Sequence, residues 1–327
     1  MNEIGGYNLF INYSDNIVNS VLFNSKHYKF ALARHSLVFI INNFKFKRII
    51  LPSYTCNSIY EIIKDLDITI LKYNLSEHFL PSNININDSD LLVVNNYFGL
   101  FDNYSKLHKF ISQFTYNQIL IDNSHSISKR KSFKNNLSMI SPRKFLALTD
   151  GGILYDPKAL LNDEYLPKEV DLSWERSKWL FRGYDEGGRY KSYYEYLKFR
   201  ESIQSIPYKE MSLMTIKLIS QYNLDKIISE RRKVFFNLRR NLGLPKVFKQ
   251  IKFSTSSLPI GFPLEVSDNI IAQKYFSEKK IYTVCYWNNQ SNISLNEFEK
   301  FIASKILFLP LDINIKIDQI IKGISFL

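Results

Sequence analysis

A single lysine stands just ahead of a turn that leaves no room for side chains. Lys144 is followed by a short, mostly apolar run that leads to Asp150 and the pair Gly151–Gly152. The amine of a lysine can hold an aldehyde cofactor as a Schiff base, which is one form of covalent catalysis. Most lysines are solvated surface charges, so this chemistry at Lys144 needs support from other residues.

That support comes from a predicted strand upstream of the lysine. Residues 119–121 form a short apolar run, and Asp122 and His125 follow it. In doubly wound sheets ligands bind at the carboxyl ends of strands, so Asp122 is expected to face the binding crevice. Two other interpretations stay open at this point. Asp122 can cap a helix, and His125 can be a packed or a surface histidine.

A third group of residues suits a phosphate. Residues 33–37 lie at the start of a predicted helix over 35–43, where unpaired N–H groups and the helix dipole favour an anion. Arg34 can add a charged fork to such a phosphate. The run therefore predicts an anion site at the beginning of this helix.

Composition and charge narrow the class of protein. The chain has 327 residues, of which 45% are hydrophobic and 23% are charged, so it can bury a large core and is not a disordered protein. Its net charge of +12 suits a nucleic-acid partner, but the cations lie in short scattered clusters without a nucleic-acid module. We expect a solvated basic surface and no nucleic-acid partner. Such a surface also attracts an anionic substrate.

Neither a membrane protein nor a secreted disulfide-rich protein is expected. No apolar stretch approaches the roughly 18 residues of a membrane helix, and residues 1–12 do not resemble a secretion signal. The two cysteines, Cys56 and Cys285, are too few for a disulfide scaffold or a metal knuckle. We therefore predict a cytoplasmic protein that has no metal site and no membrane partner.

The first half of the chain alternates between strand-like and helical patterns, which predicts a mostly parallel sheet flanked by helices. Strands are predicted at 48–51, 68–71, 91–94 and 119–121, and helices at 35–43, 58–64 and 104–114. A further helix is expected over 211–244, followed by strand-like runs at 258–266 and 280–284. We predict a large domain over 1–210, with a rim or dimer segment at about 157–209, and a smaller domain over 211–327.

The order of a strand-end acid, a lysine and a glycine pair resembles fold type I enzymes that use pyridoxal phosphate. Among them it is similar to the nucleotide-sugar aminotransferase (DegT-like) family, in which Asp-x-x-His/Gln ends a strand and the lysine precedes Gly-Glu-Gly-Gly. Here Thr149 and Asp150 replace the first glycine and the glutamate. Further runs resemble family motifs in family order, namely 3–7, 33–37, 51–56, 95–99 and 307–311.

The resemblance implies the fold and a set of roles. The fold would be α/β, with a seven-stranded, mostly parallel sheet and a smaller C-terminal α+β domain. Lys144 would hold pyridoxal 5'-phosphate, Asp122 would pair with its pyridine nitrogen, and His125 would contact its phenolic oxygen. The remaining cofactor-binding candidates are Arg34 and His35 at the phosphate, Ser141 or Ser138 as a phosphate hydroxyl, and Tyr54 or Cys56 against the ring. Ser141 is favoured over Ser138.

The function that the resemblance implies is the transfer of an amino group from an amino acid, expected to be glutamate, to a nucleotide-linked keto-sugar. Such enzymes act as homodimers in the synthesis of O-antigen, capsule or other glycoconjugates. Two alternatives remain. One is other pyridoxal chemistry, such as sugar dehydration or amination of a small phosphorylated ketone, and Lys144 argues against the dehydratase. The other is a non-catalytic binding module that keeps the fold.

Overall fold

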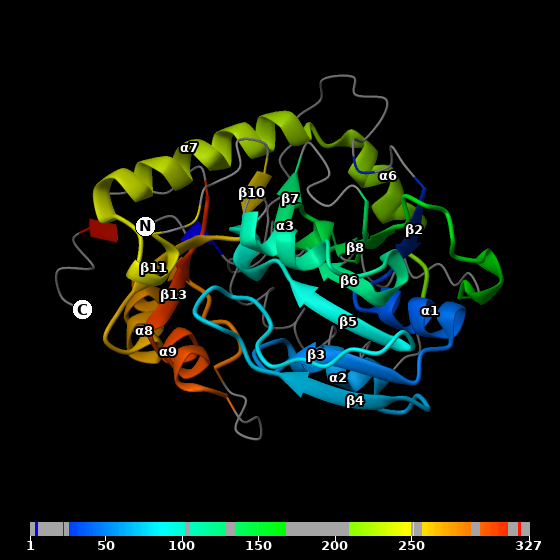
Figure 1. The fold of residues 1–327 in the computed structure, drawn as a ribbon. Helices are drawn as coiled ribbons and strands as arrows, with labels where there is room; N and C mark the ends of the chain where they lie inside the picture. Colours follow the sequence, from blue (N-terminus) through cyan, green and yellow to red (C-terminus); the bar gives the residue numbers. More distant parts are fainter. Residues whose placement is uncertain are drawn as a thin grey trace.

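The computed structural model describes most of the chain from Lys26 onward. The described residues are 4–5, 22, 26–101, 105–128, 135–148, 150–167, 209–249, 251, 257–288, 295–312 and 320–321. Within them, helices cover both faces of a central sheet, and a smaller unit lies to one side (Figure 1). Thr149 and most of the predicted rim segment 157–209 lie outside the described residues.

The central sheet has seven strands in the order β2-β9-β8-β6-β5-β3-β4. β9 runs antiparallel to both of its neighbours, and the other strands all run in one direction. The strands are β2 (His27–Phe30), β3 (Arg48–Pro52), β4 (Thr69–Tyr73), β5 (Asp90–Asn95), β6 (Ile119–Asp122), β8 (Leu137–Ile140) and β9 (Gly152–Tyr155). The predicted α/β fold with a mostly parallel sheet of seven strands is therefore confirmed.

The sequence pattern predicts some of these strands and misses others. The four apolar runs are confirmed as β3, β4, β5 and β6, each beginning within one residue of its predicted start. β2, β8 and β9 are not predicted, because they are short and contain polar or glycine residues in place of a continuous apolar run. Ser138 lies inside β8, and β9 begins at Gly152 of the tight turn.

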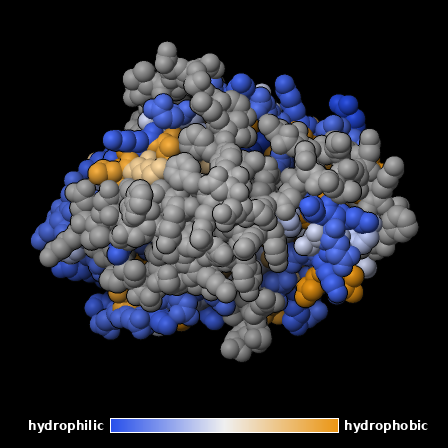
Figure 2. Space-filling model, turned by 180° about the vertical axis from the view of Figure 1, so that it is seen from behind, coloured by the Kyte–Doolittle hydropathy of each residue, from blue (hydrophilic) through white to orange (hydrophobic). Residues whose placement is uncertain are grey.

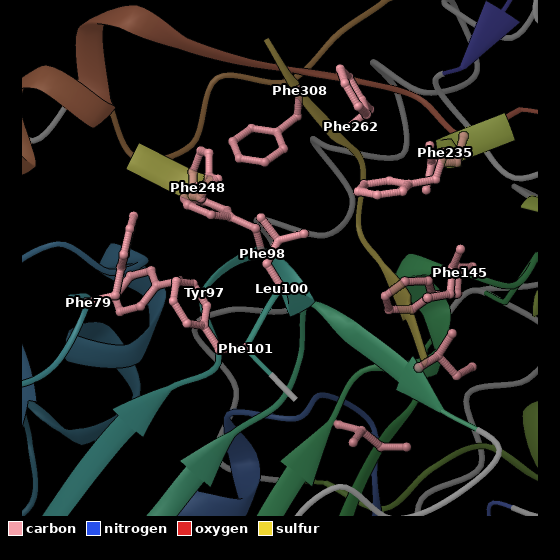
Figure 3. Packing of buried hydrophobic residues seen from close by; sticks show 14 of the residues in the cluster. Phe79, Tyr97, Phe98, Leu100, Phe101, Phe145, Phe235, Phe248, Phe262 and Phe308 are labelled. Carbon is pink, nitrogen blue, oxygen red and sulfur yellow. The ribbon is translucent and has the colours of Figure 1, made fainter. Parts of the chain in front are cut away.

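Each face of the sheet has its own hydrophobic core. On the first face, α1 (His35–Phe44) and α2 (Asn57–Ile63) pack against the sheet, and α1 contributes Leu37, Phe39 and Ile40. On the second face lie α3 (Ser105–Ile111), α6 (Leu213–Gln221), α7 (Leu224–Leu242) and the C-terminal strands. Figure 3 shows part of this second core, where Phe98 lies 4.3 Å from Phe308 between ring centroids. Parallel strands need cover on both faces, and the two cores provide it.

The helix predicted over 211–244 is wrong as a single helix, because the chain breaks it into α6 (Leu213–Gln221) and α7 (Leu224–Leu242). Tyr222 takes an extended backbone, and the side chain of Asn223 accepts a hydrogen bond from the amide of Lys226, which caps α7. The Tyr222 hydroxyl donates to the buried carbonyl of Ala147 at 3.2 Å. Packing and a cap thus fix the break that the apolar periodicity hides.

Beyond α7 the chain forms a smaller α+β unit, seen at the left of Figure 1. Its elements are β10 (Ser257–Pro259), β11 (Phe262–Glu265), α8 (Asn269–Glu278), β12 (Ile281–Tyr282), α9 (Glu297–Lys305) and β13 (Ile306–Leu309). Two ladders join this unit to earlier parts of the chain, since β12 pairs with β1 (Ile4–Gly5) and β10 with β7 (Ser126–Ser128). In addition, the buried side chain of Glu299 in α9 accepts hydrogen bonds from the Leu75 amide at 2.9 Å and from Asn74 at 2.7 Å. The domain boundary at residues 210 and 211 stays a prediction.

The described part of the surface is mainly hydrophilic. In the face shown in Figure 2, most coloured residues are hydrophilic, and hydrophobic ones form small separate patches. Ile270 and Ile271 at the start of α8 are the most exposed pair of neighbouring large hydrophobic residues among those described, at 58% and 65%. None of the described helices has both the length and the apolar character of a membrane crossing.

Candidate active site

Polar residues collect where the parallel strands end. Asp122 is the last residue of β6 and lies in register with Asn95 of β5 and Met139 of β8. Side chains alternate along a strand, and Leu120 belongs to the core of the first face. Asp122 and Asn95 are therefore directed toward the same face of the sheet as α1.

The carboxylate of Asp122 is fixed by its own turn. Its Oδ1 accepts a hydrogen bond from the Ser124 amide at 2.9 Å, and its carbonyl accepts one from the Asn96 amide at 2.9 Å. Within the described residues, Oδ2 of Asp122 has no hydrogen bond. β7 follows this turn, so Asp122 caps no helix. The geometry leaves one carboxylate oxygen for a ligand at the end of the strand.

His125 is buried and lies against aromatic rings. Its imidazole is 5.4 Å from the Trp287 ring between centroids, with 13° between the two planes, and 4.6 Å from the ring of Tyr286. Burial and, second, the positive charge of Lys144 hold the pKa of His125 well below its usual value. The ring is therefore neutral at pH 7. Lys144, in the turn after β8, is thus close enough for its charge to act on His125.

Lys144 ends a short turn that follows β8 directly. In this turn, Pro142–Lys144, the Lys144 amide donates to the Ser141 carbonyl at 3.1 Å, and the Lys144 side chain is half-buried. Asp150, which replaces the glutamate of the family motif, accepts hydrogen bonds from the amide and the hydroxyl of Ser212, each at 2.9 Å, and from the Thr215 hydroxyl. Asp150 therefore fixes the start of α6, beside the turn that carries Lys144.

The first turn of α1 contains a buried hydroxyl group, that of Ser36. The amides of residues 35–37 donate to carbonyls three residues earlier in the chain. The Ser36 hydroxyl, by contrast, is fully buried and has no hydrogen-bond partner among the described residues. Nδ1 of His35 accepts a hydrogen bond from the Lys209 amide at 3.0 Å, so His35 holds the segment that leads into α6. Arg34 is the residue that immediately precedes the helix.

Gly152 lies against the entry to this helix. A Cβ atom at position 152 would stand 2.2 Å from the backbone nitrogen of Ala33 and 2.4 Å from the carbonyl carbon of Leu32. Only a residue without a side chain allows this approach. The glycine pair of the predicted motif therefore brings the turn that follows Lys144 into contact with the start of α1.

The other predicted residues divide between the two faces. Ser141 follows β8 and is buried beside the Lys144 turn, whereas Ser138 alternates with Met139 and is directed away from the face of Asp122 and α1. Cys56 precedes α2 on that same first face, with its Sγ 3.0 Å from the Ser58 hydroxyl. Tyr54 is buried in the core of the second face. The structure thus brings Ser141 and Cys56, but not Ser138 and Tyr54, toward the face that carries α1.

Sequence reasoning missed three residues at this end of the sheet. Asn95 is buried, its amide donates to the Thr55 hydroxyl at 3.0 Å, and its Oδ1 has no partner among the described residues. The polar residue that ends an otherwise apolar strand was the available signal. Ser36 lies inside the quoted 33–37 run, but the hydrogen bonds of the turn decide which donor remains. Trp287 has no sequence signal that relates it to His125.

Comparison with known proteins identifies solved structures with a similar fold. No protein-family model matches the sequence, and no curated protein matches it significantly. Solved structures do match. The sugar aminotransferase CalS13 from Micromonospora echinospora is 11% identical with a TM-score of 0.60, over 92% of this chain and 87% of that one. A DegT DnrJ EryC1 StrS aminotransferase from Brucella abortus is 12% identical with a TM-score of 0.56, over 92% and 86%.

The chain has the fold of sugar aminotransferases. A third match, NtdA from Bacillus subtilis, has a TM-score of 0.62 at 10% identity over 93% of this chain and 74% of that one, and was crystallised with bound cofactor PMP. The residues of the candidate site in this chain suit such a cofactor. The buried Ser36 hydroxyl needs a partner, the first turn of α1 has no acidic side chain, and Asp122 keeps one oxygen available.

Proposed function

We propose that this protein is a pyridoxal-phosphate-dependent aminotransferase that moves an amino group from an amino acid, expected to be glutamate, to a nucleotide-linked keto-sugar. The observation that supports the proposal is that Asp122 ends β6, that Lys144 follows the neighbouring strand β8, and that the charge of Lys144 helps to lower the pKa of the buried His125. The proposed setting is a homodimer in the cytoplasm that serves the synthesis of O-antigen, capsule or another glycoconjugate.

Each residue has a role that its surroundings support. When bound, pyridoxal phosphate supplies an electron sink for the carbon that carries the substrate amine. The Asp122 carboxylate, held through Oδ1, would bind a protonated ring nitrogen with its other oxygen. Ser36, Ser141 and Arg34 would bind the phosphate near the start of α1. His125, as a neutral imidazole, would donate a hydrogen bond to the phenolic oxygen of the cofactor or accept one from it.

Lys144 would attach the cofactor and, as a free amine, move the proton between the substrate carbon and the cofactor. Proton transfer requires an amine that can lose its charge, and a charged histidine nearby would oppose the positive forms of the site. Because His125 is kept neutral, it would contact the cofactor without adding a second positive charge near Lys144. The basic chain, with its net charge of +12, would attract the anionic nucleotide part of the substrate.

The test combines a spectrum with one substitution. With pyridoxal phosphate added, the protein should absorb near the edge of the visible range, and borohydride should fix the cofactor to Lys144. Glutamate should bleach this band, and a panel of keto-sugar nucleotides should identify the acceptor. The Lys144→Ala variant should lose the reducible adduct and lower the amination rate by roughly 10²–10⁴-fold.

A matched control is Lys158→Ala, since Lys158 lies over the ring of Tyr116 at the other end of the sheet. This variant should keep the spectrum and the rate. The assignment of Lys144 is wrong if Lys144→Ala keeps the same reducible adduct. A protein that binds the cofactor at Lys144 but is never bleached by any amino donor would instead support the non-catalytic binding module.

A further inference from the structure

An aromatic wall, made of Phe98, Tyr286 and Trp287, stands against the imidazole of His125. The ring of Phe98 lies 6.1 Å from the imidazole at 20°, that of Trp287 lies 5.4 Å away at 13°, and the two rings are 6.2 Å apart at 26°. The three centroids form a nearly equilateral triangle of almost parallel rings. Phe98 and Trp287 therefore do not sandwich the imidazole but lie beside each other against it, and Tyr286 closes the wall at 4.6 Å.

The backbone at the wall takes an unfavourable conformation. Phe98 has φ 57° and Trp287 has φ 53°, which is the left-handed region that bulky residues rarely adopt. Such a conformation persists only where the surrounding structure imposes it, and it is common at functional sites. Next to Phe98, Gly99 lies so close to the backbone of His125 that a Cβ atom there would stand 2.1 Å from the His125 carbonyl oxygen. The turn after β5 is thus pressed onto the turn after β6.

The segment that carries Trp287 is held from two sides. The Tyr54 hydroxyl donates to the Tyr286 carbonyl at 3.0 Å, and the ring of Tyr54 meets that of Trp287 edge-on at 4.9 Å. On the other side, Val284 and Phe308 exchange backbone hydrogen bonds of 3.0 and 2.9 Å. Tyr54, a candidate from sequence for the cofactor ring, supports Trp287 in this structure, and its role at the cofactor stays a prediction. The turn after β5 and this C-terminal segment therefore both contact His125, and Tyr54 supports the segment.

We infer that Trp287 is a positioning residue, which fixes the plane of the His125 imidazole and keeps water away from it. The groups that face His125 are Lys144, from the turn after β8, and the residues of the aromatic wall. Because the wall removes water and Lys144 adds positive charge, both disfavour a protonated ring. The inference rests on the proposed function for the use made of His125, while the effect of the wall on the imidazole is measurable without any activity.

The experiment is a pH titration of the histidine ring signals in the full chain, labelled at histidine and measured without added cofactor. The chain has five histidines, and the signal of His125 is the one lost in His125→Gln. In the unsubstituted protein this signal should titrate well below the pH range that is usual for a histidine. Trp287→Leu should raise the pKa of His125 by about 1 unit or more, and Trp287→Phe, which keeps a flat ring, should largely restore the original behaviour.

Phe308→Leu is the matched control, because Phe308 packs on Phe98 and Tyr286 of the wall but makes no ring contact with His125. It should leave the pKa of His125 unchanged. An unchanged pKa in a folded Trp287→Leu protein overturns the inference, and so does an equal rise in Phe308→Leu. If Trp287→Leu does not fold, the unsubstituted protein decides, since absence of a nuclear Overhauser contact between the imidazole and the Trp287 indole also overturns it. Failure of pyridoxal phosphate to attach to Lys144 would contradict the proposed function but leave this titration unaffected.

Discussion

The buried polar groups at the two ends of the central sheet differ in whether they have hydrogen-bond partners. At the amino end, Asp90 accepts hydrogen bonds from Arg48 at 2.8 Å and from the Asn87 amide at 2.7 Å. Asp156 accepts them there from the Tyr116 hydroxyl at 2.6 Å and the Leu161 amide at 2.9 Å. Both carboxylates are fully buried and have partners on each oxygen.

At the carboxyl end, several buried polar atoms have no hydrogen-bond partner among the described residues. They include the Ser36 hydroxyl, Oδ1 of Asn95 and Nε of Arg143. Phe98 and Trp287 also hold left-handed backbone there. An unpaired buried polar group costs free energy, typically about 1–3 kcal/mol, and a ligand or water that pairs these atoms would remove that cost. The paired groups at the amino end stabilise the fold, and the unpaired groups at the carboxyl end support the proposed binding site.

The sharpest test of this contrast is Gly152→Ala, at the carboxyl end. The added methyl group would meet the backbone of Leu32 and Ala33, which cannot move without shifting the start of α1. We expect the free energy of unfolding to fall by about 3 kcal/mol, as urea denaturation would measure, and affinity for pyridoxal phosphate to fall as well.

Gly243→Ala is the control for backbone strain, because Gly243 has φ 71° and ψ −174° but nothing within 4 Å of a Cβ atom. It should cost about 1–3 kcal/mol through backbone conformation alone and leave cofactor affinity unchanged. An equal loss of cofactor affinity in the two variants would contradict the role of the close contact at Gly152.

A smaller effect on stability, without any effect on the site, is expected at the amino end. Asp90→Asn removes the charged partner of Arg48 and should lower the free energy of unfolding by about 2 kcal/mol at pH 7. The hydrogen bond from Arg48 holds the pKa of Asp90 below its usual value. A lowered pKa contributes stability above the usual value of about 3.9, and this contribution is lost as the pH falls through the folded pKa.

The difference in the free energy of unfolding between the original protein and Asp90→Asn should therefore shrink as the pH is lowered from 7 toward 3, as urea denaturation would measure. Asp65→Asn is the control, because Asp65 is an exposed carboxyl shortly before the start of β4. This variant should change the free energy of unfolding little at either pH. A loss of cofactor affinity in folded Asp90→Asn would break the division between the two ends.

The sequence predicts this division only in part. Apolar runs such as 91–94 predict buried parallel strands, and a polar residue after such a run predicts a position at the carboxyl end, which is how Asp122 and His125 become candidates. The contacts of Asp150 with Ser212, and of His125 with Trp287, join positions far apart in the chain, and no local pattern encodes them. The same holds for the break at Tyr222, where tertiary packing overrides helical periodicity. The chemical roles of Lys144, Asp122 and His125 stay predictions.

The smallest expected effect concerns an exposed ion pair at the amino end. It tests whether burial of the charged groups, and not charge pairing as such, is what stabilises this end of the fold. Lys26 pairs with Asp163 at 3.3 Å near the start of β2, but their side chains are 42% and 63% exposed. Water already solvates both charges, and ordering two flexible side chains offsets much of the attraction. Asp163→Asn should therefore change the free energy of unfolding by less than about 0.5 kcal/mol, with the difference from the original protein vanishing at high salt. If urea denaturation instead shows a loss as large as that of Asp90→Asn, then pairing at this end stabilises the fold regardless of burial, and the contrast between the two ends must rest on the unpaired groups at the carboxyl end alone.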